Sequence, residues 1–161
     1  MTWQTEITPM VRYLIGDVSD TPTYSDTRLQ NTILIAAQLM SKEVSFDTEY
    51  TVDISNSGIS PDPTTTRDDS FITLSALKSA CIIAKSELRT YGLTGMKVTD
   101  GPSSIDTTGM GSNLKNSAGS ACEAYSQALR QYMLGNGVGF KIIAGPYTQY
   151  NNSPYNNLLG G

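Results

Sequence analysis

Histidine is absent from this 161-residue chain. Histidine is the usual general base near neutral pH, the commonest protein ligand of metal ions, and the partner that activates serine or cysteine nucleophiles. The absence of histidine therefore excludes most hydrolase mechanisms. It does not exclude catalysis by carboxylates alone. Since no nucleophile has a visible activating partner in the sequence, we expect a protein that is not an enzyme and that uses no cofactor.

Charged residues are also scarce, at 16% of the chain, against about 25% in typical soluble proteins. The net charge is −4, and the eleven Lys and Arg residues stand singly, so no basic run is available to hold a nucleic-acid backbone. Residues 1–69 hold eleven acids and four bases, whereas residues 70–161 hold four acids and seven bases. If the two halves form different surfaces, neighbouring copies attract head to tail; if folding interleaves them, both signs share one surface.

Only two cysteines are present, and no apolar run is long enough for a membrane-spanning helix. Cys81 and Cys122 lie in apolar helical patterns, where a free thiol behaves as a small core residue, and two cysteines alone cannot form a zinc site. We therefore expect free thiols and a reducing compartment. The first residues lack the features of a signal peptide, so we expect a soluble protein made inside the cell.

Two helices are predicted near the start of the chain. Thr8 followed by Pro9 is typical of a helix start, which favours a short helix over 9–15. Ser25 is a suitable N-cap for the next helix, and the clearest apolar stripe of the chain follows it. That stripe consists of Leu29, Ile33, Ala36, Ala37, Met40 and Val44.

Two further helices are predicted in the second half. One is capped by Asp68 or Asp69, carries apolar residues on one face, and ends near Gly92. The other has its apolar stripe between Leu114 and Tyr132, with Gly135 as its stop signal.

Two irregular segments, 46–69 and 92–111, are predicted to form β arms. Apolar and polar residues alternate in the first arm before a turn at 56–58, and in the second arm residues 96–99 could pair with residues 104–107. The apolar arm positions are Tyr50, Val52, Ile54, Met96 and Val98. With a last strand expected over 138–143, the predicted fold class is mainly α (α+β). It is a small four-helix bundle domain over residues 1–144 with inserted β arms.

Three features resemble ligand sites, and each has a plainer explanation. Asp62, Asp68 and Asp69 do not follow the spacing of a calcium loop, so helix capping and loop solvation are the better interpretation and no metal is expected. The glycine clusters at 109–115 and 135–139 complete no phosphate-binding signature and suit hinges or helix ends. Tyr125 and Tyr132 are interpreted as core or interface packing.

The last segment, residues 145–161, is uncharged and rich in Tyr and Asn, and we expect it to be an extended C-terminal tail. Aromatic and aliphatic anchors spaced by small polar residues are typical of a segment that folds on a partner; an unused flexible end is the alternative. The candidate anchors are Tyr147, Tyr150, Tyr155, Leu158 and Leu159.

The opening of the chain resembles that of head-to-tail connector proteins of tailed bacteriophages, also called adaptor or head-completion proteins. The likeness is carried by the segment Val11–Asp17, by Tyr24-Ser25-Asp26 leading through Leu29 into a long helix, and by the order of helix, arm and capped helix that follows to Leu88. It covers roughly the first 90 residues; the segment 92–111 and the Tyr/Asn tail are not part of it.

This resemblance implies a structural virion protein at the neck, in a homo-oligomeric ring, commonly of twelve copies, between the capsid portal and the tail. DNA would pass through the ring without sequence-specific binding, the arms would contact neighbours or tail and neck proteins, and residues 145–161 would dock on the portal protein. Two other interpretations are open: another neck or tail-terminator ring, or a small intracellular ligand-binding domain or enzyme.

Overall fold

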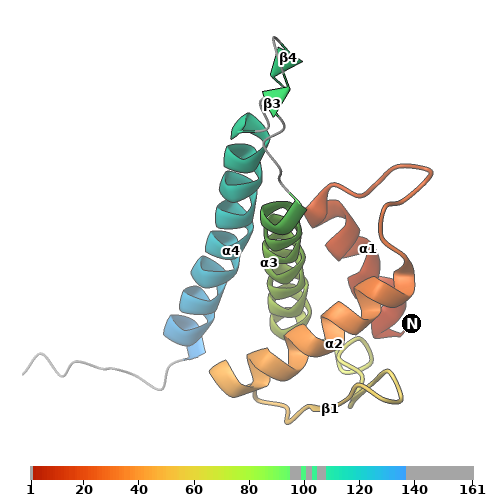
Figure 1. Ribbon diagram of the computed structural model, residues 1–161. Coiled ribbons are helices and arrows are strands. Elements are labelled where there is room, and N and C mark those ends of the chain that lie inside the picture. The colour runs from red at the N-terminus through yellow and green to blue at the C-terminus, as the bar shows by residue number, and fades with distance from the viewer. Residues whose placement is uncertain (1, 95–98, 101–102, 105–107, 137–161) are drawn as a thin grey trace, which may run out of the picture.

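The computed structural model describes residues 2–94, 99–100, 103–104 and 108–136 (Figure 1). In these residues the chain forms four helices and two short hairpins. The elements are α1 (Trp3–Ile15), α2 (Asp26–Glu43), β1 (Thr51–Asp53), β2 (Gly58–Ser60), α3 (Asp69–Thr94), β3 (Thr99–Asp100), β4 (Ser103–Ser104) and α4 (Thr108–Asn136). The prediction of a mainly helical fold with inserted β arms is confirmed.

Helix α3 is the centre of the fold, because it packs against each of the other three helices. In Figure 1, α2 crosses α3, whereas α4 runs beside α3 in the opposite direction. The core is formed mainly by α1, α2 and α3, and α4 contributes Ala118 and Tyr125 to it. The largest fully buried side chains include Ile7 and Val11 of α1, Leu29, Ile33, Leu34 and Met40 of α2, and Phe71 of α3.

Helix α1 begins six residues before the predicted start, and the assignment of Thr8 as its cap is wrong. The first helical N–H, that of Trp3, is bound by the carboxylate of Asp62 at 3.2 Å. Pro9 lies inside the helix, and Thr8 is buried. A carboxylate supplied from a distant segment satisfies the free amide, so the local Thr-Pro signal does not set the boundary.

The predictions for α2 and α3 are confirmed. The hydroxyl of Ser25 accepts the N–H of Arg28 at 3.3 Å, and the whole apolar stripe of α2 is buried. Asp68 caps α3, since its Oδ1 accepts the N–H of Phe71 at 2.9 Å. Helix α4 extends from Thr108 to Asn136, so it starts six residues before Leu114 and runs through the first glycine cluster.

Both arms form antiparallel hairpins. In the first, Val52 pairs with Ile59, and the turn includes Ser57 with a positive φ of 51°. In the second, Thr99 pairs with Ser104, whereas Met96, Val98 and residues 105–107 lie outside the described residues. The strand expected at 138–143 and the tail also lie outside them.

The expectation of two free thiols is wrong, because Cys81 of α3 and Cys122 of α4 form a disulfide bond. Their Cα atoms are 4.6 Å apart. Each cysteine lies on the apolar face of its helix, as predicted, but the two faces meet, and this depends on packing that the spacing of the residues does not show. The argument for a reducing compartment therefore loses its basis.

Candidate interaction surfaces

Arg12 organises the corner between α1 and α2. Its guanidinium binds Asp17 Oδ2 at 2.7 Å, Asp26 Oδ1 at 2.6 Å and the carbonyl oxygen of Tyr24 at 2.8 Å. Asp17 in turn accepts the N–H of Thr23 at 2.7 Å and the N–H of Tyr24 at 3.1 Å. These contacts hold the loop between α1 and α2 closed.

Asp17 is held as a carboxylate. Its burial alone would raise its pKa, but the hydrogen bonds from Thr23 and Tyr24 and the charge of Arg12 outweigh burial and lower the pKa below its usual value. The sequence placed Asp17 only in a helix-breaking segment. The spacing of five residues could have suggested the ion pair between Asp17 and Arg12. It could not have shown that Asp17 also accepts the N–H groups of Thr23 and Tyr24.

The loop held by Arg12 borders a groove of about 400 Å³, which we call the corner groove. Two of its apolar residues are largely exposed, Tyr13 at 77% and Val18 at 57%. Large exposed apolar side chains that gather at one place are typical of interaction sites. The groove is lined by Pro9, Arg12, Tyr13, Asp17, Val18, Ser19, Asp20, Pro22 and Asp26.

The outer face of α2 is a second exposed apolar surface, which the sequence analysis did not identify. Ile35 and Leu39 lie one helical turn apart and are 43% and 48% exposed. Helical spacing places them in one row with Arg28, Thr32 and Lys42, and we call this row the α2 stripe. The spacing of 35 and 39 outside the buried stripe was the available signal, because a surface helix usually has polar residues there.

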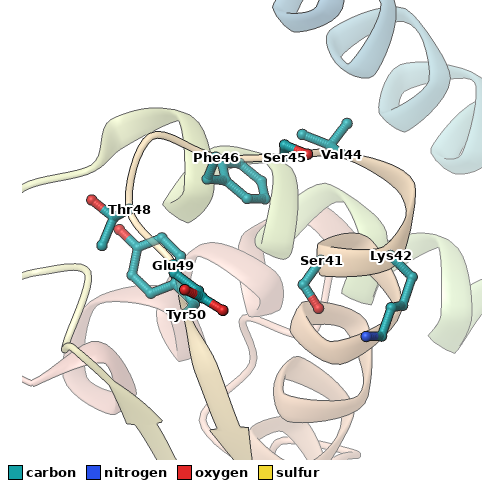
Figure 2. A pocket seen from close by; sticks show the side chains of 8 residues that line it. All are labelled: Ser41, Lys42, Val44, Ser45, Phe46, Thr48, Glu49 and Tyr50. Atoms are coloured by element: carbon teal, nitrogen blue, oxygen red, sulfur yellow. The ribbon is translucent and has the colours of Figure 1, made fainter.

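A second concave surface lies between the end of α2 and the first hairpin, with a volume of about 410 Å³ (Figure 2). Ser41 and Lys42 come from the last turn of α2, and the other lining residues come from the segment that follows. The lining residues are Ser41, Lys42, Val44, Ser45, Phe46, Thr48, Glu49 and Tyr50. Lys42 and Glu49 are its only charged groups.

Aromatic packing attaches this segment to the helices. The ring of Phe46 lies 5.2 Å from that of Phe71 and 5.3 Å from that of Tyr132, measured between centroids. Tyr50 packs on Phe71 at 3.9 Å and donates its hydroxyl to Asp68 at 2.9 Å. Burial and the bond to Asp68 raise the pKa of Tyr50 to about 12.

The predicted arm residues therefore occupy different environments. Tyr50 is buried within its own chain, Val52 is half-buried, and Ile54 is 42% exposed. Met96, Val98 and the five tail residues Tyr147, Tyr150, Tyr155, Leu158 and Leu159 lie outside the described residues. Their assignments to neighbours, tail and portal stay predictions.

A polar network joins α2, α3 and α4. Glu43 accepts a hydrogen bond from Lys78 at 2.6 Å and another from the hydroxyl of Tyr125 at 2.5 Å. The Lys78 ammonium also lies 4.4 Å from the centroid of the Tyr125 ring. Burial and the bond to Glu43 raise the pKa of Tyr125, so at neutral pH this phenol is a donor. Tyr125 serves core packing, as predicted.

The three aspartates considered for calcium have separate contacts. Asp62 binds the amides of Trp3 and Thr64, Asp68 binds Phe71 and Tyr50, and Asp69 pairs with Arg67 at 2.9 Å. Among the described residues no group of three His, Cys, Asp or Glu side chains is placed to hold a metal ion. No helix in the same part of the chain is long and apolar enough to cross a membrane.

Comparison with known proteins gives no relative: no family model, no curated protein and no solved structure matches this chain.

Proposed function

We propose that this protein is a structural virion component that forms a ring at the neck of a tailed bacteriophage, between the capsid portal and the tail. The observation that carries this proposal is that one chain exposes two different apolar surfaces, the corner groove and the α2 stripe. A closed ring of identical subunits requires two unlike, mutually complementary surfaces on each copy. The resemblance of residues 11–17 and 24–29 to phage connectors supports the same function.

The charge of the chain suits a conduit for DNA. A channel through which DNA slides should not retain phosphates, and the net charge of −4 with singly placed bases meets that requirement. The ring would complete the channel below the portal and offer the docking surface for the tail.

The rigid core suits a mechanical function. The disulfide between α3 and α4 and the network of Glu43, Lys78 and Tyr125 hold the helices together. The Arg12 network fixes the loop that carries Val18. Exposed apolar residues on such a fixed frame lose little conformational entropy on association.

Electron microscopy of the negatively stained protein, alone and mixed with the portal protein of the same phage, tests this function. We expect rings with a central opening and rings stacked on the portal. A protein that stays monomeric at all concentrations and does not bind the portal would overturn the proposal.

A tail deletion tests the portal contact separately. Removing residues 145–161 should leave the circular dichroism spectrum unchanged and abolish portal binding, because the proposed anchors are lost. A matched variant keeps the tail at full length and replaces Tyr147, Tyr150 and Tyr155 by Ser. Portal binding that survives both changes would refute the assignment of the tail.

A further inference from the structure

We propose that the corner groove of one copy receives the α2 stripe of the next copy, and that this contact is the subunit interface of the ring. The inference rests on the proposed ring function and adds the surfaces that build it. It follows from the shape, the apolar content and the charge of the two surfaces.

The corner groove is apolar and acidic. Tyr13 and Val18 expose most of their surface in this groove. Pro9 and Pro22 also line the groove, and they add no hydrogen-bond donor because proline has no N–H group. Three carboxylates and one guanidinium line the groove, which gives it a formal charge of −2. Among the described residues Asp20 has no ion-pair partner, so it is available to a cation from outside.

The α2 stripe is apolar and basic. Ile35 and Leu39 form its centre, with Arg28 at one end and Lys42 at the other, which gives it a formal charge of +2. The two acids of α2 are the first and last residues of the helix. Asp26 is paired with Arg12, and Glu43 is paired with Lys78. A helix face with apolar residues at such spacing is a common ligand of an apolar groove.

A copy cannot fill its own groove with its own stripe. Both surfaces belong to a rigid corner, and Leu39 lies 13 residues beyond Asp26 on a continuous helix. At 1.5 Å per residue this places Leu39 about 20 Å along the helix from the groove lining. Among the described residues, the groove of the same copy therefore cannot cover the stripe, whereas the groove of a second copy can.

Charge selects a head-to-tail contact over a face-to-face contact. Two stripes would bring two basic faces together, and two grooves would bring two acidic faces together, so both symmetric pairings are repulsive. When the groove of one copy meets the stripe of the next, apolar residues contact apolar residues and acids contact bases. Since this contact uses a different surface on each partner, it repeats from copy to copy and closes a ring when the rotation permits.

Two variants test the interface, each altered on one surface. The stripe variant carries Ile35→Gln and Leu39→Gln, and the groove variant carries Val18→Lys and Asp20→Lys. All four side chains are exposed, so both variants should fold, which thermal melts check. The control carries Asn116→Lys and Ser120→Lys on the exposed side of α4, outside both surfaces.

Light scattering coupled to size-exclusion chromatography gives the oligomeric state. We expect rings from the wild type and the control, monomers from each variant, and a 1:1 dimer from an equimolar mixture of the two variants. The dimer is the specific result, because one intact groove then meets one intact stripe and no further copy can add. A mixture that stays monomeric would overturn the inference.

The outcomes separate this inference from the proposed function. If both variants still form rings, the interface lies elsewhere and the ring function stands. If the wild type is monomeric and does not bind the portal, both proposals fail.

Discussion

Arg12 and Asp17 form a 2.7 Å ion pair across Gly16, the residue that ends α1 with a left-handed φ of 74°. Asp17 is only 7% exposed, and its carboxylate also holds the amides of Thr23 and Tyr24. One charged side chain thus joins the end of α1 to the residues just before α2. The position of Val18, and with it the shape of the corner groove, depends on this carboxylate.

Stability should fall when Asp17 becomes protonated. Burial opposes the shift, but the hydrogen bonds from Thr23 and Tyr24 and the charge of Arg12 lower the pKa of Asp17 below the ordinary value of 3.8. A group with a lowered folded-state pKa contributes stability that is complete above its unfolded-state pKa and is lost as pH falls through its folded-state pKa. We therefore expect the melting temperature to drop in the pH range below about 4.

Melting curves of Asp17→Asn check this assignment. The variant should be less stable than the wild type at neutral pH, and the difference should shrink as the pH falls below 3.8. Asp47→Asn, at an exposed acid in the segment after α2, is the matched control and should follow the wild type. A constant difference between Asp17→Asn and wild type at every pH would contradict the prediction.

The disulfide should contribute strongly to stability. Cys81 and Cys122 are 41 residues apart in sequence, and closing a loop of that length in the unfolded chain is worth up to about 4 kcal/mol. Replacing both cysteines by Ser should lower the free energy of unfolding by about 2–4 kcal/mol, measured by urea denaturation. Dithiothreitol should destabilise the wild type and leave the double variant unchanged. Equal urea midpoints for the wild type and the double variant would contradict this.

Helix α2 shows what the sequence predicts well. Its cap, Ser25, and its buried stripe lie within one segment, so local rules contain all the information that defines it. The first hairpin and α3 are similar, because strand alternation and the Asp68 cap are local as well.

The disulfide could not be predicted, because it depends on residues far apart in sequence. The start of α1 depends partly on such a contact and partly on a local capping box, in which Thr5 Oγ1 accepts the N–H of Thr2 at 3.3 Å. The amide of Trp3 is bound by Asp62, 59 residues later, and Cys81 meets Cys122 only because α3 and α4 pack side by side. Of the two candidate surfaces, one could be predicted from local sequence and the other could not. Exposure of Ile35 and Leu39 could be read from helical spacing, whereas the corner groove needs the fold of the loop after α1.

Asp62 should stabilise α1 from outside the helix. Its pKa is lowered, because hydrogen bonds from Thr64 and Trp3 outweigh partial burial, so it is ionised at neutral pH. Replacing it by Ala removes the acceptor of the first helical amide and should cost about 1 kcal/mol in urea unfolding. Asp47→Ala, an exposed acid in the segment after α2, is the control and should change stability little. A loss no larger than that of the control would show that water replaces Asp62 as the cap.

The hydroxyl of Tyr125 should matter more than that of Tyr132, although both lie on α4. Tyr125 donates to the charged Glu43 at 2.5 Å in a partly buried position, whereas Tyr132 reaches the carbonyl oxygen of Ser45 at 3.5 Å near solvent. Tyr125→Phe keeps the ring over Lys78 but leaves one carboxylate oxygen without its donor, which should cost about 1.5–3 kcal/mol. Tyr132→Phe should stay within about 0.5 kcal/mol of the wild type. Urea denaturation of both variants measures the difference. Equal losses would mean that Glu43 is held by Lys78 alone, and that α4 is attached to α2 and α3 by apolar packing and the disulfide.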